Sequence, residues 1–260
     1  MGKEDDAARY TAIAERIRQA FNRSYFDAGR GTYANPSQTS QVLPLYTGLV
    51  PTEYVDTTSA ALVQSVHAAD DHLGTGFVGL FPLLKVLGQL GQEELAFRIA
   101  NQDDVPGWWS MIKDGGTTVT EYWDSHTGTR NLINLAGPLG VWFYETVAGI
   151  RLDPSHPGYE HINLKPQPIG DLTYAEAQTE TIRGEVKGSW KLAEGKLFVS
   201  VTIPANTTAT LVLPVAANAA VQEAEGDGTG VTPSTGAHSY ASWTRELGSG
   251  TYHFNVPFHR

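Results

Sequence analysis

Two carboxylates, Glu121 and Asp124, lie three residues apart in a segment that is rich in large aromatic side chains. Four of the six tryptophans fall in this region of the chain: Trp108, Trp109, Trp123 and Trp142. Aromatic rings stack against the C–H bonds of sugars, and carboxylates bind sugar hydroxyls or, when held among rings, transfer protons. The segment therefore predicts a carbohydrate site.

Within this segment Glu121 is the strongest candidate for chemistry. It stands directly before Tyr122 and Trp123, and the pair Gly115-Gly116 allows the backbone to bend sharply ahead of it. Asp124 and His126 either orient Glu121 by hydrogen bonding or simply face water. A plain polar patch on a loop is the alternative for the two acids, but so many large rings are unusual for an ordinary loop. Trp142, among apolar neighbours, is more typical of a core residue.

A second polar cluster, Asp70-Asp71-His72, offers two carboxylates and an imidazole. These groups can bind a metal, but adjacent side chains seldom converge on one ion without further ligands. The sequence favours a solvated turn that caps the next helix, and it predicts no metal. If the cluster is functional, its place at a helix entrance favours substrate contact by His72. The following G-x-G-x-x-G pattern at 74–79 lacks the preceding strand of a dinucleotide site.

Length and composition limit the classes of protein that the chain can belong to. Its 260 residues, 41% of them hydrophobic, suffice for one large domain or two ordinary ones. The net charge of -10 repels phosphate backbones and anionic lipid, so neither nucleic acid nor membrane is expected as a partner. There is no cysteine, which excludes a thiolate metal site and a cysteine nucleophile. We recognise no signal peptide or apolar membrane span and therefore expect a cytoplasmic location.

The first part of the chain has helical periodicity. Apolar residues at 10, 13, 17 and 21 predict a first helix over about 8–21 with one buried face. Further helices are expected at about 38–49, 58–69, 76–90, 92–102 and 138–149. In the last of these, Pro138 suits the first turn and Gly149 suits the C-terminal cap. The segment 1–152 is thus predicted to be a helical domain.

Beyond residue 153 the apolar period changes to two, which is typical of strands. Strands are expected at 186–192 and 197–203, joined by a turn at Glu194-Gly195, and again at 209–215 and 252–258. The segment 216–250 is rich in small residues and predicts a long loop with at most weak strands. The segment 153–260 is therefore predicted to be a β-sandwich domain, with Trp190 and Trp243 in its core rather than on a binding face.

Several collinear motifs resemble the C-terminal part of an α-L-rhamnosidase of glycoside hydrolase family 78. Among them are FNRSYFD at 21–27, SQTSQ at 37–41, HLGTGFVG at 72–79 and GGTTVTEYWD at 115–124. The resemblance implies an α+β multidomain fold, in which part of an (α/α)6 toroid of helical hairpins is followed by an antiparallel β-sandwich. It also implies inverting hydrolysis of terminal L-rhamnosyl or related glycosides, with a water between two carboxylates and without metal or organic cofactor.

The same resemblance implies a role for Glu121 as general base, and Trp108 matches an aromatic position at the sugar subsite. The other substrate-binding residues that we expect from the residue pattern are Trp109, Tyr122, Trp123, Asp124 and His72. The chain departs from the family pattern in having Thr120, where a tryptophan is usual, and in having no histidine at 131–134.

The family's general acid lies upstream of the segment that matches here. The expected partners are therefore a carbohydrate substrate and either the N-terminal half of such an enzyme or a second copy of the chain. A non-catalytic protein that binds a carbohydrate or a partner protein is the alternative function. A toroid lyase or epimerase is a third option, for which an active-site tyrosine or a histidine pair would be expected.

Overall fold

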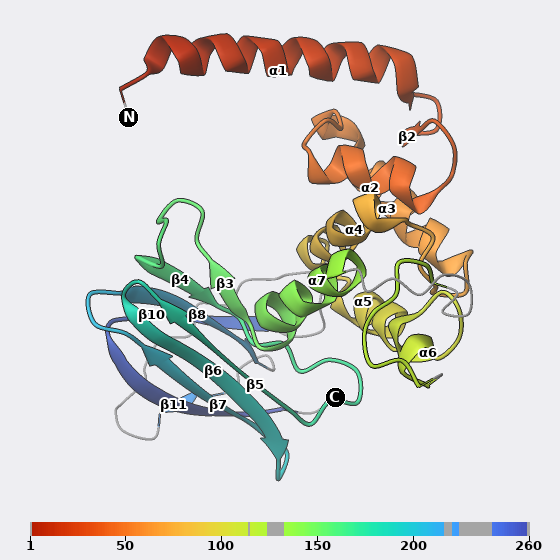
Figure 1. Ribbon diagram of the computed structural model, residues 1–260. Coiled ribbons are helices and arrows are strands. Elements are labelled where there is room, and N and C mark those ends of the chain that lie inside the picture. Colours follow the sequence, from red (N-terminus) through yellow and green to blue (C-terminus); the bar gives the residue numbers. More distant parts are fainter. Residues whose placement is uncertain (1, 114, 124–132, 216–219, 224–240, 259–260) are drawn as a thin grey trace. The chain divides into compact units, whose positions relative to one another are not determined.

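The computed structural model describes residues 2–113, 115–123, 133–215, 220–223 and 241–258. The chain forms two compact units (Figure 1). The first comprises residues 1–90 and 98–136, and the second comprises residues 91–97 and 137–260. Helices dominate the first unit and strands dominate the second, so the protein is of the mixed α+β class that we expected.

The first unit is built from helices joined by short connections. The helices are α1 (Glu4–Tyr25), α2 (Gln38–Tyr46), α3 (Val55–His67), α4 (Phe77–Gln89), α5 (Glu93–Ala100) and α6 (Trp108–Lys113). Residues of α5 up to Phe97 group with the second unit. A small hairpin of β1 (Phe26–Asp27) and β2 (Thr32–Tyr33) follows α1, and a 3-10 turn, η1 (Thr52–Tyr54), precedes α3.

The core of the first unit lies where α2 contacts α3 and α4. Val42, Leu62, Leu80 and Leu83 are completely buried there, as the helical spacing of apolar residues requires. The start of α2 is fixed by Ser37, whose hydroxyl oxygen accepts a hydrogen bond from the Ser40 amide. The buried apolar residues and the Ser37 cap therefore both fix the position of α2.

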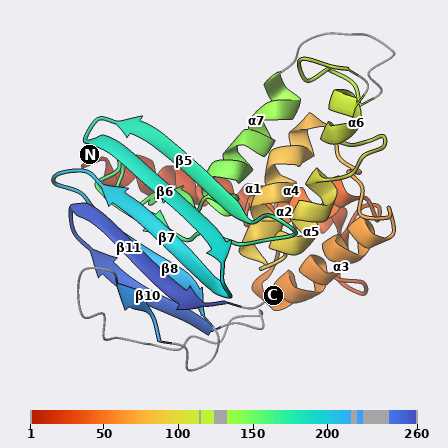
Figure 2. The same ribbon diagram turned by 90° about the horizontal axis from the view of Figure 1, so that it is seen from below.

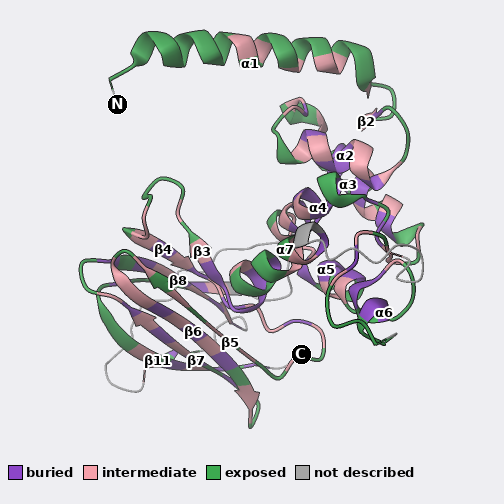
Figure 3. Ribbon diagram, in the orientation of Figure 1, coloured by how far each residue is buried: buried purple, intermediate pink, exposed green. Residues whose placement is uncertain are grey.

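Helix α1 confirms the first predicted helix, but it has no buried residue, so the expectation of one buried face was wrong. Tyr10 is 62% exposed and Ile17 is 58% exposed. Figure 3 shows only intermediate and exposed positions along this helix. The C-terminal end of its apolar stripe contacts the β1–β2 hairpin, where the rings of Phe21 and Tyr33 lie 5.7 Å apart, whereas Tyr10 and Ile17 stay exposed.

The second unit contains the end of α7 (Ile133–Trp142), a π-helical turn η2 (Phe143–Val147) and two sheets. Their strands are β3 (Ile150–Leu152), β4 (His161–Leu164), β5 (Tyr174–Thr181), β6 (Gly184–Ala193), β7 (Lys196–Ile203), β8 (Thr208–Val215), β9 (Gln222–Glu223), β10 (Ala241–Leu247) and β11 (Gly250–Pro257). One sheet has the order β10-β8-β4-β3 and the other β5-β6-β7-β11-β9.

The two sheets form a sandwich (Figure 2). Buried and less buried residues alternate along β7 and β8, and the rings of Trp243 on β10 and Phe254 on β11 lie 5.6 Å apart. Trp190 and Trp243 are 2% and 1% exposed, which confirms that both belong to the core. The pairing is antiparallel throughout except between β4 and β8, which run parallel.

Several predicted elements differ in detail from the observed ones. The turn at Glu194-Gly195 is confirmed, with φ angles of 53° and 69°, but Pro138 lies inside α7 instead of in its first turn. Residues 108–113, for which the sequence predicted no element, form α6, and part of the expected loop 216–250 forms β10 along β8. The domain division at residues 152 and 153 stays a prediction.

Within the described residues no helix has the length and apolarity needed to span a membrane.

Candidate active site

A tight backbone turn brings the chain from α6 into the segment that carries Glu121. The amide of Gly116 donates to the carbonyl of Met111 at 2.9 Å, and Gly115 has a left-handed φ of 85°. A Cβ atom on Gly116 would lie 2.5 Å from that carbonyl oxygen. Only glycine fits this turn, so the sharp bend predicted from the Gly-Gly pair is present.

Thr120 ties the segment to α6. Its side chain is buried, its hydroxyl donates to the Tyr122 carbonyl at 2.6 Å, and the same oxygen lies 3.5 Å from Sδ of Met111. The backbone that carries Glu121 is therefore held in place. Glu121 is half-buried, while Tyr122 is 55% exposed. The small Thr120 side chain stands where the resemblance would place an aromatic ring.

Trp108 and Trp123 form a pair of indole rings near Glu121 in the chain. Their centroids lie 5.5 Å apart with the planes at 83°, an edge-to-face arrangement. Trp108 is 4% exposed, and its indole N–H donates to the Leu135 carbonyl at 2.7 Å. Trp108 thus supports Trp123 from the core, whereas Trp109, at 48% exposed, presents its ring to solvent. Asp124 and His126 lie outside the described residues.

His72 is held in place through both ring nitrogens. Nε2 lies 2.6 Å from Oδ1 of Asp104, and Nδ1 lies 2.9 Å from the Asp70 carbonyl. The hydrogen bond to Asp104 raises the pKa of His72, and the same bond lowers the pKa of Asp104. Since acceptors face both nitrogens, the protonated imidazolium is the form that this environment favours.

Asp71 points to a different set of partners. Its carboxylate accepts hydrogen bonds from Nδ1 of His67 at 2.6 Å and from Nε of Arg98 at 2.7 Å. Burial raises the pKa of Asp71, but the bonds from Arg98 and His67 outweigh it and leave the pKa below its ordinary value. Asp71 and His72 therefore do not converge on a shared ligand.

The turn at 70–72 is strained and braced. Asp70 and Asp71 have φ angles of 51° and 58°, and Nε2 of Gln102 donates to both of their carbonyls at 3.1 Å. The cap of α4 is Gly76, with no side-chain bond, so the expectation that the acidic turn caps this helix was wrong. No group of three metal-ligating side chains occurs in the part of the chain that the structure describes.

The sequence predicts Glu121 and its neighbouring rings as a site, but it gives no signal for the residues that hold the neighbouring loops. Asp104 and Gln102 contact residues 32 positions away in the chain, and no spacing signal marks such a pair. The first unit thus carries a half-buried carboxylate at Glu121, two exposed aromatic side chains at Trp109 and Tyr122, and a braced histidine loop. These are groups that can bind a polyol and move a proton.

Comparison with known proteins shows that the chain belongs to a family of glycosidases. The model of the bacterial alpha-L-rhamnosidase 6 hairpin glycosidase domain matches residues 1–147. The model of the bacterial alpha-L-rhamnosidase C-terminal domain matches residues 149–228. The family resemblance noted in the sequence is therefore confirmed, as is a fold of helical hairpins followed by a sandwich.

The chain is similar to alpha-L-rhamnosidases from Streptomyces avermitilis and Formosa agariphila, with 34% and 33% identity over 260 and 223 residues. These matches cover 96% and 82% of the chain but only 24% of each relative. The chain thus spans about a quarter of the length of these relatives.

Solved structures agree with this assignment. An alpha-L-rhamnosidase from Dictyoglumus thermophilum superposes with a TM-score of 0.88 at 32% identity, over 98% of this chain and 29% of that one. The Streptomyces avermitilis enzyme complexed with L-rhamnose superposes with a TM-score of 0.83 at 33% identity, over 96% of this chain and 24% of that one.

Proposed function

We propose that this chain is a C-terminal portion of an α-L-rhamnosidase-like glycoside hydrolase, with Glu121 as the general base. The observation that carries the proposal is the position of Glu121. It follows a turn that only glycine fits, it is half-buried two residues before Trp123 of the Trp108–Trp123 pair, and it lies in the matched glycosidase domain. The substrates proposed are terminal L-rhamnosyl or related glycosides.

In this mechanism Glu121 takes a proton from a water molecule, which attacks the anomeric carbon from the side opposite the leaving group. A second carboxyl group, at about 6.5 to 9.5 Å from the base, must protonate the leaving oxygen in an inverting enzyme. We propose that this donor comes from a part of the enzyme outside these 260 residues. The chain alone is then not a competent glycosidase.

The neighbouring side chains divide into two roles. Trp109 and Tyr122 are exposed and can stack on a sugar, whereas Trp108 packs against the half-buried Trp123 and holds it in position. The hydrogen bond with Asp104 raises the pKa of His72 and so favours the protonated imidazolium at the braced loop. The role of Asp124 in substrate binding stays a prediction. The cytoplasmic location also stays a prediction.

The test replaces Glu121 by Gln in an assembled enzyme that contains this chain. Removal of a general base lowers turnover by about 10²- to 10⁴-fold, and KM is expected to change little because the amide keeps the shape of the side chain. The control is Glu53→Gln, an exposed acid on η1. A Glu121→Gln enzyme with the turnover of the control would refute the assignment.

The buried Trp108 and the small Thr120 favour one alternative, a protein that binds carbohydrate without cleaving it. Both features reduce the aromatic surface next to Glu121. An assembled wild-type protein that binds an aryl rhamnoside, but releases no phenol from it, would select this alternative over the hydrolase.

A further inference from the structure

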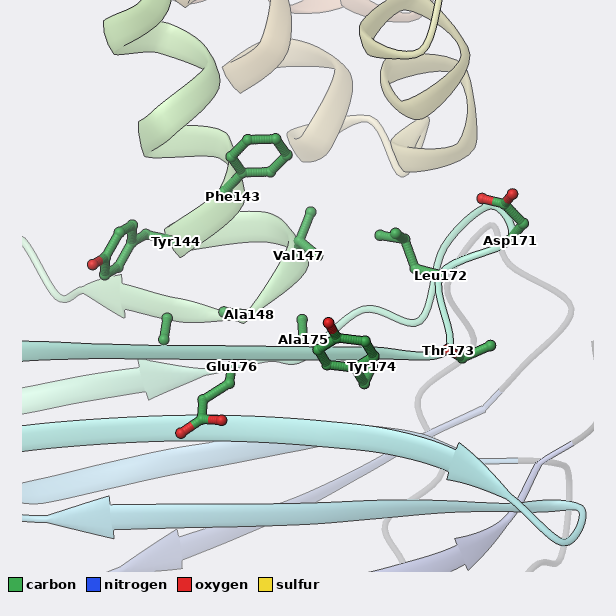
Figure 4. Close-up of a pocket in the computed structure, with 11 residues that line it drawn as sticks. Phe143, Tyr144, Val147, Ala148, Asp171, Leu172, Thr173, Tyr174, Ala175 and Glu176 are labelled. Carbon is green, nitrogen blue, oxygen red and sulfur yellow. The ribbon is translucent and has the colours of Figure 1, made fainter.

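A groove lies in the second unit between η2 and the edge strand β5 (Figure 4). Its volume is about 610 Å³, and its apolar lining includes Val147, Ala148, Ala175 and Ala177. Figure 4 shows Ala175 pointing toward η2, while Glu176 points to the other side of the strand, as the alternation of a strand requires. The small alanine side chains of β5 leave the space open.

The walls of this groove are held by hydrogen bonds from both sides. The indole N–H of Trp190 donates to the Val147 carbonyl at 2.7 Å, which ties η2 to β6. The hydroxyl of Tyr144 donates to the Gln178 carbonyl at 3.2 Å, which ties η2 to the free edge of β5. The groove is therefore preformed, as binding sites for small molecules usually are.

Exposed rings and carboxylates surround the groove. Phe143, Tyr144 and Tyr174 line it and are 50%, 45% and 69% exposed. Asp171 and Glu176 also line it, and both are exposed. Rings that stack on C–H faces, together with carboxylates that accept hydroxyl hydrogen bonds, form the combination that suits a saccharide.

A second hollow, on the outer face of the five-stranded sheet, continues from the first. Its volume is about 450 Å³, and the two hollows share Tyr174, Ala175 and Glu176. In the sheet register Tyr174 pairs with Lys191, and Lys191 pairs with Phe198. Two strand spacings, about 9 to 10 Å, therefore separate the two rings, which is a length that a short oligosaccharide spans.

Polar side chains occupy the next row of the same face. These are Glu176, Ser189, Ser200 and His253, which follow one another across β5, β6, β7 and β11. Within the described part of the chain none of these side chains forms a hydrogen bond to another residue, so their polar atoms are available to a ligand. Hydroxyl, imidazole and carboxylate groups bind sugar hydroxyls in the gaps between stacked rings.

We propose that this surface, from Phe143 over Tyr174 to Phe198, is a binding site for a neutral saccharide chain. A protein interface has an apolar centre with few charges, whereas here charged and hydroxyl groups separate the rings. The carboxylates of Asp171 and Glu176 outnumber the one ammonium of Lys191 within the two hollows, which disfavours acidic sugars. The site lies in the second unit, does not include Glu121 and does not rest on the proposed hydrolase function.

The test is calorimetric titration of the full chain with neutral oligosaccharides of glucose, of xylose and of L-rhamnose, and with an oligogalacturonate as the acidic probe. We expect saturable binding of at least one neutral probe and weaker binding of the acidic one. Tyr174→Ala should raise the Kd by about tenfold, because the most exposed stacking ring is lost. Phe198→Ala should weaken binding in the same direction.

Three control variants test whether the loss of binding is specific to this surface. Ile182→Ala removes an 88% exposed apolar side chain just beyond β5 that cannot stack on a sugar, and should leave the Kd unchanged. Trp123→Ala and Glu121→Gln should also leave it unchanged. The inference is overturned if no neutral probe binds, if Tyr174→Ala binds like Ile182→Ala, or if the acidic probe binds more tightly. It is also overturned if Trp123→Ala abolishes binding, or if Tyr174→Ala changes the mass of the particle in solution instead.

Discussion

At the scale of single residues, the pair of His72 and Asp104 links two loops of the first unit through one charge-assisted hydrogen bond of 2.6 Å. The His72 side chain is 19% exposed and the Asp104 side chain is 69% exposed, so solvent weakens the interaction without removing it. The imidazole of His72 is a group whose charge can change near neutral pH, so this contact makes the candidate site sensitive to pH.

We predict that Asp104→Asn lowers the pKa of His72, because the hydrogen bond to Asp104 is the largest cause of its elevation. The measurement is an NMR pH titration of the His72 ring protons. Asp103→Asn is the matched control, since Asp103 pairs with Lys113 at 2.9 Å and not with the histidine. Equal His72 pKa values in the two variants would contradict the prediction.

The raised pKa of His72 also determines in which direction the stability of the protein changes with pH. A pKa that is raised in the folded state means that the folded protein binds the proton more tightly than the unfolded chain does. The stabilisation by His72 is therefore complete below the ordinary histidine pKa and is lost as the pH rises through the raised value. In Asp104→Asn this part of the pH dependence should be smaller.

How much the sequence predicts at this scale depends on whether the signal is local. Glu121 is recognisable because its rings and its glycines lie within a few residues of it in the chain. The burial of Trp108 and its bond to the Leu135 carbonyl depend on the packing of residues that are 27 positions apart. Such contacts are formed by the fold and leave no spacing pattern.

At the scale of elements, the passage from η2 into β3 depends on Gly149. This residue has a left-handed φ of 81°, and its carbonyl accepts a hydrogen bond from the Lys165 amide at 2.8 Å. A Cβ atom here would lie 2.2 Å from the Lys165 carbonyl carbon, which is backbone and cannot rotate away. Both the dihedral angle and the space require glycine.

We predict that Gly149→Ala destabilises the protein by at least about 1 kcal/mol, since a left-handed alanine alone costs about that much. Gly140→Ala, in α7, is the matched control, because no heavy atom lies within 4 Å of its Cβ position. Alanine in a helix is favoured over glycine by about 1 kcal/mol, so this variant should be neutral or more stable. Urea denaturation measures both, and two curves with the same midpoint would refute the argument.

The elements that the sequence predicted are those with a long, regular period. Helices α3 and α4 and the β6–β7 hairpin extend over enough residues for the pattern to be visible. Helix α6 has six residues, too few for a periodic signal, and it was not predicted. Strand β10 pairs along its full length with β8, and this long-range pairing overrides the small, polar residues around it.

At the scale of the whole molecule, the sequence indicated a helical part followed by a sandwich, because the apolar period changes from helical to alternating. The structure and the two family models agree on that order. The grouping of residues 91–97 with the sandwich had no sequence signal. It depends on tertiary contacts such as the close approach of Phe97 to Gly170, where a Cβ atom would lie 2.1 Å from the ring.

Helix α1 raises the question of what covers its apolar stripe. Most helices in proteins owe their stability to a packed apolar face and not to helix propensity alone. Here Tyr10 and Ile17, seven residues apart and hence on one face, are both more than half exposed. Either the rest of a longer enzyme or a second copy of the chain can bury this face.

We therefore predict that the chain by itself associates through α1. Burial of this stripe is favourable, and in a solution of this chain alone a second copy offers the apolar surface that can cover it. Light scattering should give a mass above 28.1 kDa that depends on concentration. Ile17→Glu should return the mass to that of one chain, while Ile182→Glu, which adds the same charge on an exposed turn of the sandwich, should not. Wild-type protein that stays monomeric at every concentration, with the helical circular dichroism that α1 contributes intact, would show that this helix needs no partner.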